Sequence, residues 1–86
     1  MSSTLFLLMA QFGGQAEIEL AEIAEHYLGM KVKRALALAA VQKLPFPVHR
    51  LGTQKSPWMV SLIDLAAYID ERRAEAQSEW QRMNAA

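Results

Sequence analysis

The sequence predicts a mainly α-helical fold with one small β-hairpin, and three observations support this fold class. Four segments repeat apolar residues at the three- and four-residue spacing of amphipathic helices. One segment carries two short β-compatible runs on either side of a polar turn that contains glycine and proline. The length of 86 residues allows one domain, which we expect to span residues 1–86.

The first expected helix begins at Thr4, whose hydroxyl is a suitable N-cap. Its apolar residues are Leu5, Leu8, Met9 and Phe12. Gly13-Gly14 follows them, and glycine readily adopts the left-handed conformation that ends helices. Because no lysine and hydroxyl residue follow this glycine pair, we interpret it as a helix stop and not as a phosphate loop.

The next segment has the form of a helix-turn-helix, over about residues 20–42. Glu17–Glu19 is expected to be extended, and Leu20–Leu28 follows helical spacing. Gly29-Met30 interrupts the pattern, and Lys31 to about Gln42 is rich in strong helix formers. Two short helices joined by a tight turn with glycine are typical of this motif.

A β-hairpin, or wing, is expected over about residues 48–61. Pro45 and Pro47 disfavour helix and favour an extended path into it. Val48–Leu51 and Trp58–Ser61 are the two predicted strands, and the polar residues 52–57 form the turn between them.

The last expected helix covers about residues 62–82. Ser61 to Asp64 fits a capping box at its start. Its apolar stripe, which Arg72 interrupts, consists of Leu65, Ile69, Ala76, Trp80 and Met83. The complete order predicts a winged helix-turn-helix with an N-terminal helix and a long C-terminal helix.

The charges are segregated along the chain, although their formal sum is zero. Between Lys31 and Lys55 there are six lysine or arginine residues and no acidic residue, whereas acidic residues cluster at 17–25 and 64–79. Because the local field steers a polyanion, this basic middle segment predicts binding to double-stranded DNA.

The helix Lys31–Gln42 is the expected reader of the major groove. A helical wheel places Val32, Leu36 and Ala39 against the preceding helix and leaves the opposite side outward. Arginine can bind guanine, glutamine can bind adenine, an aliphatic group can contact a thymine methyl, and flanking lysines suit phosphates. The residues expected to contact DNA from this helix are Lys31, Lys33, Arg34, Leu38, Gln42 and Lys43.

The wing is expected to supply a second contact, along the DNA backbone or in the minor groove. Its candidate residues are Arg50, Thr53, Gln54 and Lys55.

A homodimer is expected from the composition. The hydrophobic fraction of 52% is high for so short a chain, and the sequence has no cysteine that could stabilise a thin core with a disulfide. Exposed aromatic residues near the end of a helix favour a protein contact. The residues expected to contact a second protomer are Ile69, Ala76, Trp80 and Met83.

Several function classes are disfavoured. His26 lies four residues after Glu22, but no third ligand completes a metal site, and no nucleophile motif is present. We therefore expect no enzyme activity, no metal and no cofactor. The apolar stretch Leu5–Ala10 is too short to span a membrane and has no basic residue before it, so we expect no membrane contact and a bacterial cytoplasmic, nucleoid-associated location.

Two segments resemble the pyocin activator protein (PrtN-like) family. They are Thr4–Gly14 (TLFLLMAQFGG) and Asp64–Asp70 (DLAAYID), with Arg72-Arg73 beyond the second and Gln54-Lys55 in the wing between them. More distantly, the region from Pro45 to Asp64 is similar to the wing of AlpA-type, excisionase-type and MerR-type regulators.

The resemblance implies a transcriptional activator of pyocin or prophage genes that binds promoter-proximal DNA. It places Lys33 and Arg34 on the recognition helix, and Arg50, Gln54 and Lys55 on the wing. Two alternatives remain open at this point: an excisionase-like architectural DNA-binding protein, and a phage-encoded protein-binding module without DNA binding. Direct contact with RNA polymerase also remains open.

Overall fold

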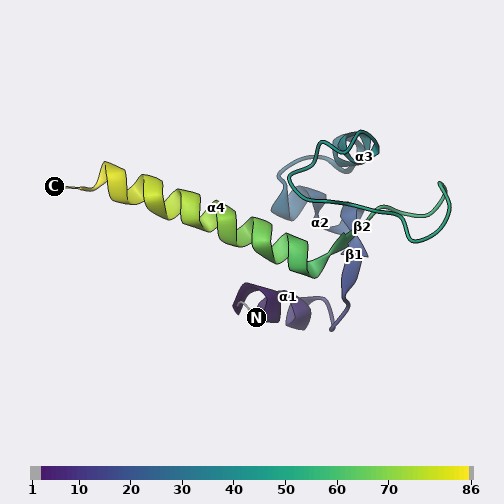
Figure 1. The fold of residues 1–86 in the computed structure, drawn as a ribbon, viewed down its shortest axis with the longest axis horizontal. Helices are drawn as coiled ribbons and strands as arrows, with labels where there is room; N and C mark the ends of the chain where they lie inside the picture. Colours follow the sequence, from purple (N-terminus) through teal and green to yellow (C-terminus); the bar gives the residue numbers. More distant parts are fainter. Residues whose placement is uncertain (1–2, 86) are drawn as a thin grey trace.

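The structure, a computed structural model, describes residues 3–85 and confirms the mainly helical class with a small antiparallel sheet (Figure 1). The order of elements is consistent with a winged helix-turn-helix layout that has an additional helix at each end. Its elements are α1 (Ser3–Gln11), β1 (Glu17–Glu19), α2 (Leu20–Tyr27), α3 (Val32–Ala40), β2 (Met59–Ser61) and α4 (Leu62–Met83).

The two strands pair differently from the expected hairpin. β2 pairs antiparallel with β1, with Ile18 opposite Val60, and the predicted strand Val48–Leu51 contributes one isolated bridge between His49 and Met59. The His49 amide donates to the Met59 carbonyl at 3.1 Å, and the Met59 amide donates to the His49 carbonyl at 2.7 Å. The wing is therefore a loop that this bridge closes.

Backbone geometry explains this pairing. Successive peptide groups of a strand point to opposite edges, so a strand can bond on both sides. Met59 bonds to His49 at one edge, while at the other edge the Leu20 amide donates to the Trp58 carbonyl at 2.9 Å. The pairing with β2 does not continue on either side of His49. Pro47 has no amide proton to donate to β2, and on the other side the chain leaves the sheet, so that Leu51 is 69% exposed.

The helix-turn-helix forms as expected, with two different helix ends. Gly29 ends α2 in the left-handed conformation, at φ 66°. α3 ends without a glycine: Gln42 has φ 55°, and the Lys43 amide donates to the Leu38 carbonyl at 2.9 Å. This pattern is a Schellman motif, in which the left-handed position is most often glycine.

α1 packs beside the first half of α4, below it in Figure 1. The expected N-cap role of Thr4 is wrong, because α1 begins at Ser3 and the Thr4 hydroxyl donates to the Asp70 carboxylate of α4. Glycine ends α1 as expected: Gly13 has φ 66°, and the Gly14 amide donates to the Met9 carbonyl at 2.7 Å.

The core lies where the sheet, α1, α2, α3 and the start of α4 meet. Its largest fully buried side chains are those of Ile18, Leu20, Ile23, Leu62, Leu65 and Val60. Each short element supplies only a few buried residues, so every element is needed to complete the core.

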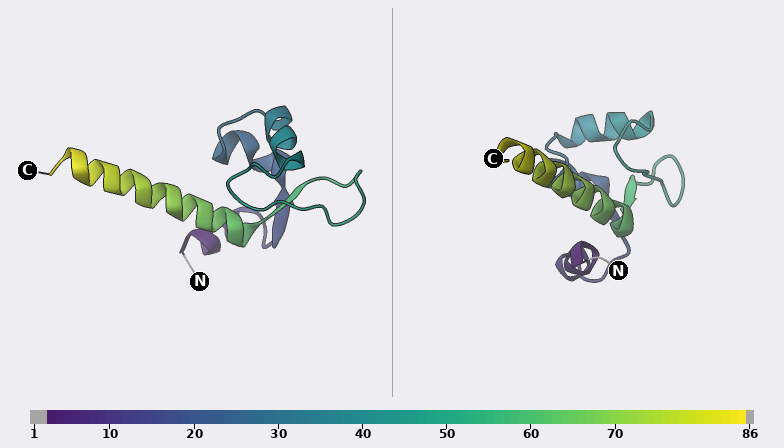
Figure 2. Two further views of the ribbon diagram at one scale, coloured as in Figure 1. Left: turned by 45° about the horizontal axis from the view of Figure 1, so that its top comes forward. Right: turned by 60° about the vertical axis from the view of Figure 1, so that its left-hand side comes forward.

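α4 begins at the sheet and ends away from the core. The Ile63 amide donates to the Ser61 hydroxyl at 3.2 Å, which confirms Ser61 as the N-cap. Residues 71–83 are all exposed, and this half of α4 extends beyond the rest of the molecule in both views of Figure 2. The principal extents of 55 × 27 × 17 Å reflect this projecting helix.

Candidate nucleic-acid interface

α3 packs on the core through small residues. Ala35 and Ala39 are fully buried, and Val32 is half-buried against the core. The expected places of two leucines are reversed: Leu36, expected inside, is 39% exposed, and Leu38, expected outside, is half-buried. Because the inward face is centred on the two alanines, a leucine one position away from Ala35 is turned toward the side of the helix.

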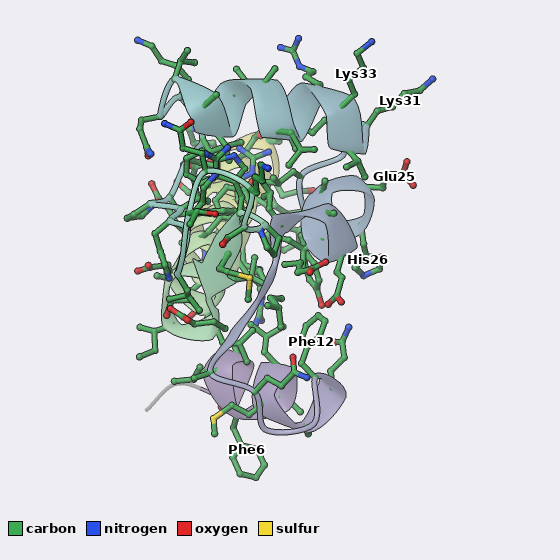
Figure 3. The ribbon with its side chains drawn as sticks, turned by 90° about the vertical axis from the view of Figure 1, so that its right-hand side faces the viewer. Phe6, Phe12, Glu25, His26, Lys31 and Lys33 are labelled. Carbon is green, nitrogen blue, oxygen red and sulfur yellow. The ribbon has the colours of Figure 1, made fainter. Side chains whose placement is uncertain are left out.

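Exposed basic residues occupy the first half of α3. Lys31, at the N-cap position, and Lys33 and Arg34 in the first turns are all exposed. Figure 3 shows Lys31 and Lys33 extending from this end of α3 into solvent. The three cations therefore stand at the end of α3 where backbone amide groups also favour an anion.

The other end of α3 presents two further candidates. Gln42 and Lys43 are exposed and follow the last helical residue, Ala40. The Schellman motif fixes their backbone, because the Gln42 amide donates to the Ala39 carbonyl at 3.1 Å. The sequence predicts a helix to about Gln42, whereas α3 ends at Ala40; no glycine marks this end, and Pro45 follows only a few residues later.

The tip of the wing is an ordered turn. The Ser56 amide donates to the Thr53 carbonyl at 2.9 Å, and the Lys55 amide donates to the Thr53 hydroxyl at 3.2 Å. Gln54 and Lys55 are exposed at this turn. Thr53 therefore shapes the turn that presents the two polar side chains.

Arg50 lies at the base of the wing, where it contacts Trp58. Its guanidinium carbon is 4.3 Å from the centre of the Trp58 ring, which is a cation–π contact. Its Nε atom is buried and has no hydrogen-bond partner within residues 3–85. The sequence predicts both residues in the strands of the wing but does not predict this pairing, because the polar turn that separates them has no local pattern that indicates it.

A second polar contact connects the wing to the sheet. The Nε2 atom of His49 lies 2.6 Å from a carboxylate oxygen of Glu17, with both side chains partly exposed. This contact, together with the His49–Met59 bridge, fixes the base of the wing on both strands.

A hollow of about 350 Å³ separates α3 from the wing. Its lining comes from α3 (Leu36, Ala40), from the wing (Arg50, Ser56, Pro57, Trp58) and from the sheet and α2 (Glu19, Ala21). The structure thus places the middle and the end of α3, at Leu36 and Ala40, opposite the wing across one concave surface, whereas the basic residues 31–34 lie outside its lining.

The residues expected to contact a second protomer all lie on α4. Ile69 is half-buried, Ala76 is exposed, and Trp80 and Met83 are 64% and 80% exposed. They are separate from α3 and the wing, so a protein contact there would leave the candidate DNA surface free.

The described part of the chain, residues 3–85, contains no group of three metal-ligating side chains. No described helix is both long and apolar enough to cross a membrane.

One comparison with known proteins found a matching protein family. The family model described as pyocin activator protein PrtN matches residues 4–76, which is most of the chain. No match was found among curated proteins or among solved structures.

Proposed function

Since this chain belongs to the pyocin activator protein PrtN family, we propose that it regulates pyocin-type genes by binding promoter DNA through α3 and the wing. The proposal is sequence-specific recognition of double-stranded DNA, with activation of transcription as the outcome. It involves no catalytic step.

One observation carries the DNA-binding part of the proposal. The basic, acid-free segment from Lys31 to Lys55 folds into the two elements on either side of the hollow. Lys31, Lys33 and Arg34 are exposed on one side, and Lys55 is exposed on the other. These four cations lie beyond the hollow itself, whose lining includes Glu19 and Arg50. On α3 and at the tip of the wing they are exposed to bind the DNA backbone, which supplies much of the affinity of such complexes.

The residues have different roles in this proposal. α3 enters the major groove, where the exposed Arg34 and Gln42 read base edges. The wing follows the DNA backbone beside the groove, and Gln54 and Lys55 contact it. Thr53 shapes the turn at the tip of the wing, and Arg50 supports the base of the wing through its contact with Trp58. The remaining cations, Lys31, Lys33 and Lys43, bind phosphates.

Gel shifts on DNA upstream of pyocin genes test the proposal. We expect a specific complex that weakens steeply with salt, because cations that bind phosphates release counterions. Arg34→Ala should reduce the preference at one base position, by about 1–3 kcal/mol. Arg82→Ala is the matched control, since Arg82 is an exposed arginine on the far half of α4 and should change nothing.

An absence of specific complex at low salt, with correctly folded protein, would refute DNA binding. Equal losses from Arg34→Ala and Arg82→Ala would refute the assigned surface even if DNA binds.

A second candidate, a protein-binding module, is favoured by the apolar part of the α3 surface. Leu36, Ala37, Ala40 and Val41 are exposed there, next to the basic residues. An apolar contact with RNA polymerase or another regulator would depend weakly on salt, whereas DNA binding would depend on it strongly. The gel shifts at two salt concentrations therefore separate the two functions.

A further inference from the structure

α4 carries an apolar stripe that begins at half-buried Ile69, beside the core, and continues along the exposed, projecting half of the helix. Ile69, Ala76 and Met83 follow one another at seven-residue intervals, and Trp80 lies between the last two. At about 100° per residue these four side chains fall within a narrow sector of the helix. Such spacing is typical of a seam between two helices.

A groove next to this stripe leads to the helix-turn-helix. It has a volume of about 500 Å³ and lies between α4 and the end of α2. Its lining is formed by His26, Tyr27, Leu28, Gly29, Tyr68, Ile69, Arg72, Arg73 and Ala76. The stripe and the groove share Ile69 and Ala76, so they form one continuous surface.

We propose that this surface binds the same surface of a second copy of the chain, with the two α4 helices antiparallel and centred on Ala76. The small side chain at the centre allows the helix axes to approach closely. In this register Ile69 of one copy lies level with Met83 of the other. Met83 of each copy then occupies the mouth of the groove beside Ile69 of its partner copy.

The charges beside the stripe favour this register. On one flank of the stripe, Arg72 of one copy lies within about 1.5 Å, along the axis, of Glu79 of the other. On the other flank, Arg73 lies similarly close to Trp80 of the other copy, an arrangement suited to a cation–π contact. Both contacts occur twice, because the pair is symmetric.

A parallel pair lacks this complementarity. It would place Arg72 of one copy beside Arg73 of the other and would leave the two Glu79 residues without a cation. The sequence of charges thus distinguishes the two orientations, although the apolar stripe alone fits both. The proposal extends the proposed DNA binding, but it does not depend on it.

Sedimentation without DNA tests the pairing. We expect the unaltered chain to be a dimer at micromolar concentration and Trp80→Ala to raise the dissociation constant about tenfold or more, because an interface aromatic is lost. Glu79→Arg should also weaken the dimer, by placing a second cation beside Arg72 of the partner copy. The double variant Arg72→Glu with Glu79→Arg should restore it. Gln81→Ala, on the outward side of α4, is the matched control. A chain that is monomeric at all concentrations would overturn the proposal.

Cross-linking tests the orientation, and the absence of cysteine from the sequence makes it direct. Chains with Arg72→Cys are mixed with chains carrying Glu79→Cys in a thiol–disulfide buffer. The antiparallel register predicts the mixed disulfide, because two copies of Arg72→Cys would hold their thiols about 12 Å apart along the axis. Glu71→Cys, on the outward side, is the control and should form no disulfide within a dimer. Predominant disulfides between two copies of Arg72→Cys would show a parallel pair and overturn the proposal.

The DNA experiments and these experiments fail independently. A dimer without a specific DNA complex would refute only the proposed function, and a DNA-binding monomer would refute only the pairing.

Discussion

At the scale of single residues, Gln42 combines an unfavourable backbone with an exposed side chain at the candidate DNA surface. Its left-handed conformation, φ 55°, costs about 1–2 kcal/mol for a residue with a Cβ atom. Glycine at this position would relieve that strain, yet glycine has no group that could bind a base. A position where glycine would be less strained but glutamine is present is a candidate for a functional side chain.

We predict that Gln42→Gly raises the free energy of unfolding by about 1 kcal/mol and weakens binding to the target DNA. Denaturant unfolding measures the first effect, and a gel shift measures the second. Gln42→Ala is the control, because it keeps the strained backbone and removes the amide. If Gln42→Gly is more stable and binds DNA equally well, Gln42 makes no base contact.

Arg50 and Lys55 both belong to the wing, but the structure separates their roles. Arg50 lies over Trp58 at the base, whereas Lys55 is exposed at the tip. We predict that Arg50→Ala destabilises the fold by about 0.5–2 kcal/mol, through loss of the cation–π contact. Lys55→Ala should leave stability unchanged and lower the slope of log affinity against log salt by about one.

Thermal unfolding measures the stability of each variant, and salt titrations of DNA binding measure the slope of log affinity against log salt. Should Arg50→Ala change the salt slope as much as Lys55→Ala without loss of stability, Arg50 is a phosphate contact and not a support of the wing.

At the scale of elements, the four helices were predictable, and the pairing of the strands was not. Apolar spacing and glycines at positions 13 and 29 gave the helices to within a few residues. The partner of β2 is β1, about 40 residues earlier, and a run of three residues has no pattern that identifies so distant a partner. The expected hairpin was therefore wrong in its pairing, although it located the wing.

The charge of the candidate surface was predictable from the sequence, but the side of α3 that faces outward was less so. The acid-free segment gave the elements that carry the cations, because the order of charged residues along the chain is read directly from the sequence. The rotation of α3 was harder to derive: four alanines and three larger aliphatic residues within Val32–Ala40 leave its buried face ambiguous. The exchange of Leu36 and Leu38 follows from this ambiguity.

The start of α4 allows a prediction about one element. The Ser61 hydroxyl accepts from the Ile63 amide, which otherwise has no partner at the first turn. We predict that Ser61→Ala lowers the free energy of unfolding by about 1 kcal/mol, whereas Ser61→Thr keeps most of the stabilisation because threonine also has a hydroxyl that can cap the helix. Denaturant unfolding of both variants checks this, and equal loss from both would instead implicate the packing of β2.

At the scale of the whole molecule, the neutral sum of charges conceals an electrostatic asymmetry. The exposed cations Lys31, Lys33, Lys43 and Lys55 belong to the acid-free segment, and all nine acidic residues lie outside it. If these four cations bind phosphates, affinity per protomer should fall about 100-fold between roughly 50 and 200 mM salt. Salt titration of the gel shift measures this, and a change below about tenfold would exclude a binding mode with four phosphate contacts.

The strands also connect the helices without any linker. Glu19 ends β1 and is the N-cap of α2, and Ser61 ends β2 and is the N-cap of α4. The half that carries α3 and the wing is therefore joined to α4 through a sheet of three residues per strand, which leaves no hinge between them in the described chain. In a dimer that forms through α4, the length of this rigid helix, and not a flexible tether, would set the distance along the DNA between the sites that the two copies bind.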